Sequence, residues 1–167
     1  MFIDAQDHTG QTPLHIAAKY GNFEGVVALV SDGEADIYET DDTNRRTALH
    51  VAKSAEVFEY LLTKTDMQKL RTIDPELALF NITLKQNPNS MPKFLDSLVT
   101  CTGDDLHGDE NQFVYDLSLF TNGTKKEICH MDRHFRVVEE GHSDLLLHPL
   151  MQLFVVRFDE FSLNDAI

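Results

Sequence analysis

The chain has 167 residues, with 28 acidic and 14 basic side chains, a formal net charge of −14 and 42% hydrophobic residues. This charge argues against nucleic acid or an anionic membrane surface as a direct partner, because both are negatively charged themselves. Two cysteines, Cys101 and Cys129, are too few for a disulfide framework, so we expect free thiols in a reducing compartment. Residues 1–10 also lack the basic and apolar segments of a signal peptide.

The first predicted helix covers residues 13–20. Thr12 is suited to cap it, and Pro13 fits the first helical position, where a missing N–H costs nothing. Leu14 and the two alanines at i+3 and i+4 fall on one face. Gly21 predicts a left-handed helix end. A second helix should follow, with an apolar face formed by Val26, Val27, Leu29 and Val30.

A second copy of this pattern begins 35 residues after Thr12, at Thr47. Extra residues lie in the loop 39–46, and no glycine ends the first helix of this copy. Residues 55–62 are therefore predicted to form the second helix directly, with a buried stripe of Val57, Phe58, Leu61 and Leu62.

The two copies resemble ankyrin repeats, whose unit is about 33 residues long. The residues that carry the resemblance, and that it implies are used in stacking, are Thr12, Pro13, Leu14, His15, Thr47, Leu49 and His50. The resemblance also implies that the histidines bond the loop of the adjacent repeat. Residues 33–37 resemble the closing turn of a unit with one residue inserted. Residues 1–65 are thus expected to hold one complete and one trimmed unit.

Stacked units normally come in threes or more, because one unit cannot bury its apolar face alone. Residues 3–7 resemble the closing loop of an earlier unit. We therefore expect the chain to be a fragment of a longer protein, or a shortened product, that starts within a stack. Protein partners should bind the helix face 14–20 and the loop before the second unit, at Tyr38, Asp41, Asp42, Arg45 and Arg46.

The second half of the chain has a different pattern. Residues 74–86 predict one helix, and Ser90 caps another with an apolar stripe of Phe94, Leu95, Leu98 and Val99. Residues 113–120 predict a strand, and residues 135–138 a second, weaker one. Pro149 is expected to start a final helix. The fold class predicted for the whole chain is mainly α: a short ankyrin-repeat stack, then a small helical linker with a two-stranded β element.

Two segments of this half, MPKFLDS at 91–97 and DLLLHPLMQLF at 144–154, occur in the same order as in transient receptor potential (TRP) cation channels. The chain resembles their ankyrin subfamily, especially the insect heat-sensing members. This implies that residues 66–158 are a membrane-proximal linker, followed by a tail at 159–167. It further implies a place on the cytoplasmic face of a membrane, reached only through downstream segments, and other channel subunits as partners in a tetramer.

The alternative interpretation is a soluble ankyrin adaptor that binds a protein partner, or a short product that co-assembles with a channel. No catalytic, cofactor or metal site is predicted. Residues 129–134 contain one cysteine and two histidines, but their spacing fits no common zinc pattern. In the acidic loop, placing Gly108 at the sixth position of a calcium loop puts Gly103 first and Val114 twelfth, so that pattern fails.

Overall fold

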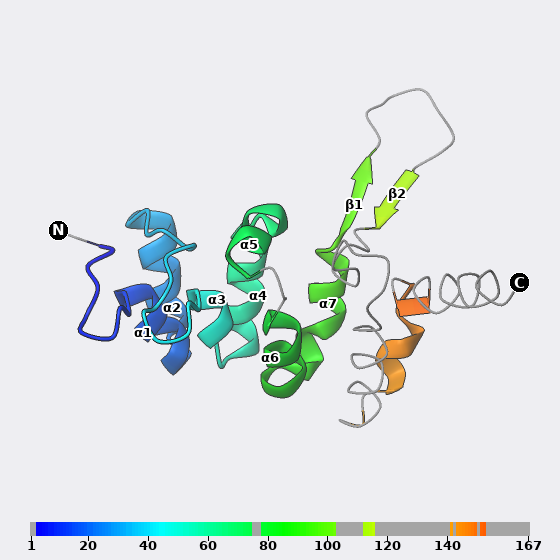
Figure 1. Ribbon diagram of the computed structural model, residues 1–167, viewed down its shortest axis with the longest axis horizontal. Coiled ribbons are helices and arrows are strands. Elements are labelled where there is room, and N and C mark those ends of the chain that lie inside the picture. The colour runs from blue at the N-terminus through cyan, green and yellow to red at the C-terminus, as the bar shows by residue number, and fades with distance from the viewer. Residues whose placement is uncertain are drawn as a thin grey trace, which may run out of the picture. The chain divides into compact units, whose positions relative to one another are not determined.

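The computed structural model of the chain describes residues 3–74, 78–102, 112–115, 141, 143–149 and 151–152. The chain forms two compact units, Met1–Met91 and Pro92–Ile167. The first unit is built from helices packed in series with loops between them, and the second contains most of helix α7 and a pair of short strands (Figure 1).

Helix α1 (Pro13–Tyr20) begins and ends where the sequence predicts. At its start, the extended backbone of Thr12 places its N–H 3.2 Å and its hydroxyl 2.9 Å from Nδ1 of His15. At its end, Gly21 has φ 69°, a left-handed conformation that a side chain would strain. Leu14 is 1% exposed, so the predicted apolar face lies in the core.

Helix α2 (Phe23–Val27) continues into a single turn of π-helix, Ala28–Asp32. The N–H of Gly33 closes this wider turn on the carbonyl of Ala28 at 2.9 Å. Glu34 then adopts φ 55°. The extra residue expected in the closing turn of this unit is therefore accommodated by a wide turn followed by one left-handed residue. Of the predicted apolar face, Val26 is buried, whereas Val27, Leu29 and Val30 are half-buried.

The second repeat has a very short inner helix, α3 (Ala48–Val51), and a longer outer one, α4 (Ala55–Lys64). Ala52 ends α3 with extended backbone at φ −64° and ψ 115°, so this turn needs no glycine. The predicted stripe on α4 is confirmed, because Val57, Phe58, Leu61 and Leu62 are all buried.

Inner helices pack on inner helices along the first unit. Helix α1 contacts α3, and α3 contacts α6 (Ala78–Gln86), while α2 contacts α4. Two hydrogen bonds join the ends of the inner helices: the N–H of Lys53 donates to Ala18 O at 3.4 Å, and Asn87 Nδ2 donates to Ala52 O at 3.0 Å. The core of this unit follows that row of helices.

Helix α5 (Met67–Ile73) was not predicted. Asp66 caps it by accepting from the N–H of Gln68 at 2.8 Å, and Leu70 is its buried residue. With one buried side chain in seven residues, the helix has almost no apolar periodicity for a sequence pattern to reveal.

In the segment from 88 onwards, a 3₁₀ turn, Pro88–Ser90, leads into α7 (Met91–Asp96). Phe94, Leu95 and Leu98 are buried, as the predicted stripe requires. Val99 is not helical and starts strand β1 (Val99–Thr102), so the prediction that the helix extends through Val99 is wrong. The run Val-Thr-Cys-Thr is rich in β-branched residues, which favour extended backbone.

Strand β1 pairs antiparallel with β2 (Gln112–Tyr115), with Val99 opposite Tyr115. The two-stranded element is not supported in the form predicted from 113–120 and 135–138. Residues 113–115 do lie in β2, but its partner is β1. Residues 116–120 and 135–138 lie outside the described residues.

The last described segment of the second unit is helical. Residues Ser143–Leu147 form a 3₁₀ helix, and Pro149, Met151 and Gln152 are α-helical, as predicted for a helix starting at Pro149. Leu145 and Met151 are buried at 6% and 0% exposure. Within the part of the chain that the structure describes, no helix combines the length and apolarity needed to cross a membrane.

Candidate functional site

The loop that precedes α1 is organised by one carboxylate. Asp7 accepts hydrogen bonds from the Thr9 hydroxyl at 2.7 Å, the Thr9 N–H at 2.8 Å and the Gln11 N–H at 3.0 Å. These bonds, with the Thr9 hydroxyl foremost, lower the pKa of Asp7 to about 2. The N–H of Asp7 in turn donates to Gln11 O at 3.0 Å, which closes the loop.

Asp41 repeats this arrangement in the loop before α3. Its carboxylate accepts from the N–H of Asn44 at 2.9 Å and of Arg46 at 3.1 Å, and its own N–H donates to Arg46 O at 3.0 Å. Unlike Asp7, which is exposed, Asp41 is only 5% exposed. Its side chain is therefore committed to holding the loop.

The same backbone position is left-handed in both loops, but the residue differs. Two residues before the capping threonine, Gly10 has φ 75° and Arg45 has φ 53°. A Cβ on Gly10 would lie 2.5 Å from the backbone N of Asp42, so glycine is required there by contact as well as by conformation. Arg45 adopts the same region with a side chain, at a conformational cost of about 1 kcal/mol.

A buried histidine links each inner helix to the next segment. His15 is 2% exposed, and its Nε2 lies 2.9 Å from Arg46 O. Because Nδ1 accepts from the Thr12 N–H, a neutral ring with its proton on Nε2 satisfies both contacts. His15 therefore joins α1 to the loop before α3 through a backbone carbonyl.

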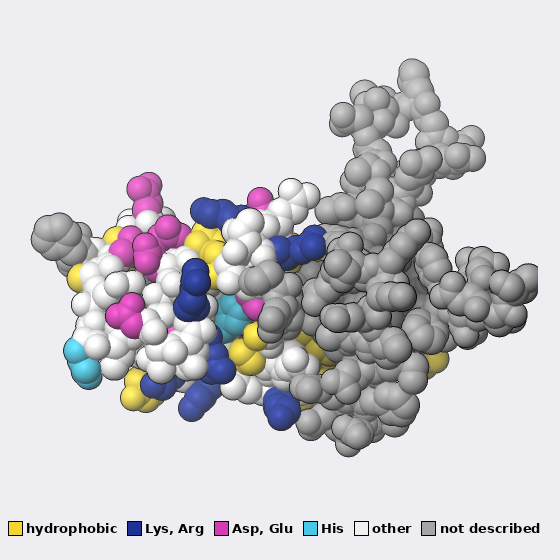
Figure 2. All heavy atoms as spheres, viewed as in Figure 1, with side chains coloured by type: hydrophobic (Ala, Val, Ile, Leu, Met, Phe, Trp, Pro, Cys, Tyr) yellow, Lys and Arg dark blue, Asp and Glu magenta, His cyan; other side chains and the backbone are white. Residues whose placement is uncertain are grey.

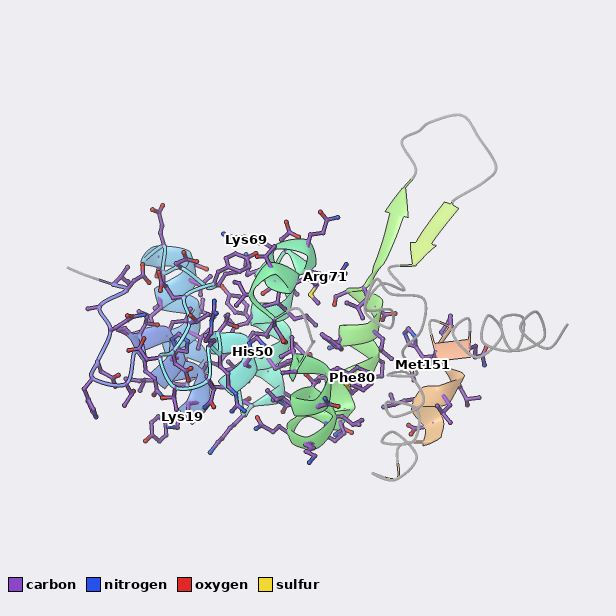
Figure 3. The ribbon with its side chains drawn as sticks, viewed as in Figure 1. Lys19, His50, Lys69, Arg71, Phe80 and Met151 are labelled. Atoms are coloured by element: carbon purple, nitrogen blue, oxygen red, sulfur yellow. The ribbon has the colours of Figure 1, made fainter. Side chains whose placement is uncertain are left out.

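His50 occupies the equivalent position on α3, but its partner is a side chain. The Nε2 of His50, which is labelled in Figure 3, lies 3.0 Å from Oδ2 of Asp74. Both residues are buried. Asp74 also accepts from the N–H groups of Ala78 and Leu79, each at 3.0 Å. Burial raises the pKa of Asp74, but the bonds from His50, Leu79 and Ala78 outweigh it and hold that pKa below its usual value.

Helix α5 lies against the loop that follows the first repeat. The N–H of Asp66 donates to the Tyr38 hydroxyl at 2.8 Å, and Nζ of Lys69 lies 3.8 Å from the centre of the Tyr38 ring. These contacts tie the tyrosine ring to α5. Tyr38 is consequently half-buried.

The five loop residues predicted to bind a partner thus have different surroundings. Asp42 and Arg45 are exposed, Tyr38 and Arg46 are half-buried, and Asp41 is buried. The N–H of Asp42 donates to Thr9 O at 3.2 Å, which holds the two loops together. A backbone hydrogen bond therefore holds the tip of the second loop against the first loop, and the side chains of Asp42 and Arg45 at this tip are exposed.

Helix α1 carries two large apolar side chains that nothing described covers. Tyr20 is 79% exposed and Ile16 is 41% exposed. They are four residues apart and so lie on one face of the helix. Together with the exposed loop tip near the start of α1, they are the candidate site for a partner.

A family model described as ankyrin repeats, in three copies, matches residues 2–72. Ankyrin repeats occupy this part of the chain. The loops, the paired inner and outer helices and the histidine contacts described above are their structural elements. Ankyrin repeats are a protein-interaction module, because stacked units present an extended surface to a partner. No solved structure matches the chain.

In the second unit, the two segments that carry the channel resemblance are in contact. Nε2 of His148, from the HPL segment, lies 3.1 Å from Oδ1 of Asp96, from the FLD segment. Asp96 is 71% exposed at its side chain and His148 is 11% exposed. The residues are 52 positions apart, so the contact brings the two segments together in the second unit.

No group of three or more metal-ligating side chains occurs among the described residues. The cysteine and histidines of residues 129–134, the acidic loop 103–111 and the tail 159–167 lie outside those residues.

Sequence reasoning missed the partner of His50. The chain has no third Thr-x-Leu-His string to predict it, and the only signal was Asp74 at the predicted start of a helix. It also missed that α5 contacts Tyr38, because neither residue type nor spacing points to a tyrosine 28 positions away.

Proposed function

We propose that this chain is a protein-interaction module whose ankyrin repeats bind a partner through the exposed face of α1 and the tip of the loop before α3. The exposure of Tyr20, at 79%, is the observation that carries the proposal. A tyrosine supplies a large contact area with few rotatable bonds and is favoured where proteins meet. Tyr20 lies on helix α1, which the buried His15 joins to the loop before α3.

Site-specific photo-crosslinking tests this proposal. A photoreactive amino acid is placed at position 20 of the full chain, and in a matched variant at Thr63, an exposed residue of the outer helix α4. We expect a discrete crosslinked protein from position 20 and none from position 63. Equal crosslinking from both positions, or none from position 20, contradicts the assignment of the binding surface.

The channel resemblance supports a finer proposal, in which the chain is the cytosolic ankyrin and linker part of a TRP-type cation channel. The order of the two segments supports it, as does the bond between His148 and Asp96, which joins them in the second unit. In that setting the linker would pass movement of the repeats, or binding of a partner to them, toward the pore, and other subunits would be partners.

Sequencing the coding region downstream of residue 167 tests this finer proposal. About six hydrophobic segments of roughly 20 residues each are expected. A stop codon with no such segments in any transcript would contradict the channel proposal and leave the adaptor proposal standing.

A further inference from the structure

The basic side chains of the first unit fall into two groups. Two lysines rest on aromatic rings: Lys64 on Tyr60 at 5.8 Å and Lys69 on Tyr38 at 3.8 Å. Arg71 also has a partner. Five others form no hydrogen bond, ion pair or ring contact through their side chains with any residue that the structure describes: Lys19, Arg45, Arg46, Lys53 and Lys85.

Three of these unpaired cations lie at or just after the C-terminal ends of successive inner helices. Lys19 is in the last turn of α1, Lys53 follows α3, and Lys85 is in the last turn of α6. The bonds Lys53 N–H to Ala18 O and Asn87 Nδ2 to Ala52 O bring these helix ends side by side. All three lysines are exposed.

The views of the molecule agree with this placement. In Figure 2, Lys and Arg side chains gather along the lower edge of the first unit, and most Asp and Glu side chains of this unit lie toward the upper edge. Lys19 lies at the lower edge in Figure 3, whereas Lys69 and Arg71 lie at the opposite edge. The bonds between the helix ends place the unpaired lysines in a row, which we call the lysine row: Lys19, Lys53 and Lys85.

We infer that the lysine row binds an acidic, extended peptide segment of the protein partner, running across the inner helices; this inference rests on the proposed protein-binding function. Packed helices lie about 8–10 Å apart. An extended peptide in the polyproline II conformation has three residues per turn and advances about 3.1 Å per residue, so every third side chain lies on the same face. A carboxylate at every third position of the peptide therefore meets one lysine on each successive helix.

The surface next to the lysine row indicates which kind of residue lies at one end of that peptide. Tyr20 follows Lys19 directly and is the most exposed large apolar side chain described on the first unit. An aromatic or aliphatic residue beside the first carboxylate would cover its ring. The arginines before α3, Arg45 and Arg46, lie at the opposite end of that helix from Lys53 and are not part of the row.

A short peptide suits this surface better than a long polyanion does. The chain has a net charge of −14, so a nucleic acid or an anionic membrane would be repelled by most of its surface. A peptide of about ten residues feels mainly the charges within the screening length of about 8 Å at physiological salt.

Fluorescence anisotropy of the full chain with synthetic peptides tests the inference. The first probe is a fluorescein-labelled decapeptide with one phenylalanine followed by glutamates at every third position. The second has the same composition with its glutamates adjacent. We expect the spaced peptide to bind several-fold more tightly than the clustered one, with affinity falling as salt rises.

Two matched variants of equal charge locate the binding. Lys19→Gln with Lys53→Gln removes two members of the row, and Lys64→Gln with Lys69→Gln removes two exposed lysines elsewhere. The first pair should weaken binding of the spaced peptide about fivefold, as expected for the loss of two exposed ion pairs, and the second less than twofold. Equal losses from both pairs, or equal affinity for both peptides, would overturn the inference.

Tighter binding to phosphatidylserine vesicles than to the spaced peptide would also overturn it. The crosslinking experiment at position 20 separates the two proposals. A crosslinked partner whose contact segment carries no acidic residues would leave protein binding intact and refute the acidic peptide. Absence of any crosslink at position 20 would instead contradict the proposed function.

Discussion

In the two ankyrin repeats that contain α1 and α3, a buried histidine bonds the next segment through two different kinds of acceptor. In the first, His15 bonds a backbone carbonyl, that of Arg46, at 2.9 Å. In the second, His50 bonds a carboxylate, that of Asp74, at 3.0 Å. A backbone carbonyl is present whatever residue stands there, whereas a carboxylate can be lost by substitution or protonated by acid. Substitution or acid can therefore remove the acceptor of the second contact but not that of the first.

The loops before α1 and α3 also differ, in the residue at their left-handed position. The first loop has glycine at its left-handed position, and the second has Arg45 there. The first loop is relaxed at that residue, while the second carries conformational strain. The two repeats therefore differ in the acceptor of the buried histidine and in the residue at the left-handed loop position. Four measurements on the full chain test these differences.

Replacing Asp74 should have the largest effect. Asp74→Ala leaves His50 Nε2 and two N–H groups of α6 without their buried acceptor, so we expect a loss of about 3 kcal/mol in the free energy of unfolding. Urea denaturation measures the loss. Asp32→Ala, at an exposed carboxylate, is the control and should change stability by less than about 0.5 kcal/mol. Equal effects would mean that the second junction does not depend on this carboxylate.

Replacing Gly10 should cause the second-largest loss in the free energy of unfolding. Gly10→Ala adds a Cβ that must strain a φ of 75° and meet the backbone N of Asp42 at 2.5 Å, so a loss of about 2 kcal/mol is expected. Gly21→Ala is the comparison, because its φ is 69° but its nearest neighbour is the Ser54 Cβ at 3.2 Å. It should cost about 1 kcal/mol. If both substitutions lower the free energy of unfolding equally, the close contact between Gly10 and Asp42 adds nothing to the cost of the left-handed conformation.

The third substitution should stabilise the chain. Arg45→Gly relieves the left-handed strain at φ 53° and should raise the free energy of unfolding by about 1 kcal/mol, less the extra entropy of the unfolded glycine. Arg46→Gly is its control, since Arg46 has no positive φ and should gain nothing. Thermal melting of both variants compares them; a gain at position 46 as large as that at 45 would exclude relief of strain as the cause.

The smallest expected effect is on acid stability. The pKa of Asp74 is lower in the folded chain than its ordinary value of 3.8, so the stabilisation it gives is present above that value. It is lost as pH falls through the lowered folded pKa. Asp74→Asn should therefore flatten the dependence of unfolding free energy on pH below about 4. A slope unchanged from the parent chain would show that Asp74 is not stabilised as a carboxylate.

Local features of the repeats were predictable from sequence because each depends on neighbouring residues. Pro13 and Gly21 bound α1 through their own backbone preferences, and the apolar spacing in α4 reports its buried face. The same reasoning gave the buried residues at the start of the second unit but not strand β1, since the end of α7 is decided by the pairing of Val99 with Tyr115.

The features that define the candidate site were less accessible. Tyr20 could be placed on a helix face, but its exposure depends on what packs beside it. The left-handed Arg45 has no sequence signal, because arginine is uncommon in that conformation. The His50 contact joins residues 24 positions apart through tertiary structure alone. Spacing therefore gave the elements of the repeats, and packing decided which side chains remain free to bind.

The wide turn at Ala28–Asp32 with Glu34 after it has a consequence for how such proteins diverge. An added residue there is taken up within one turn, and α3 still packs on α1. Repeat length can then drift between relatives without disturbing the assembly of neighbouring modules. A repeat can therefore lengthen at this turn while Thr47 and His50 of the next unit keep the contact that Thr12 and His15 make in the first.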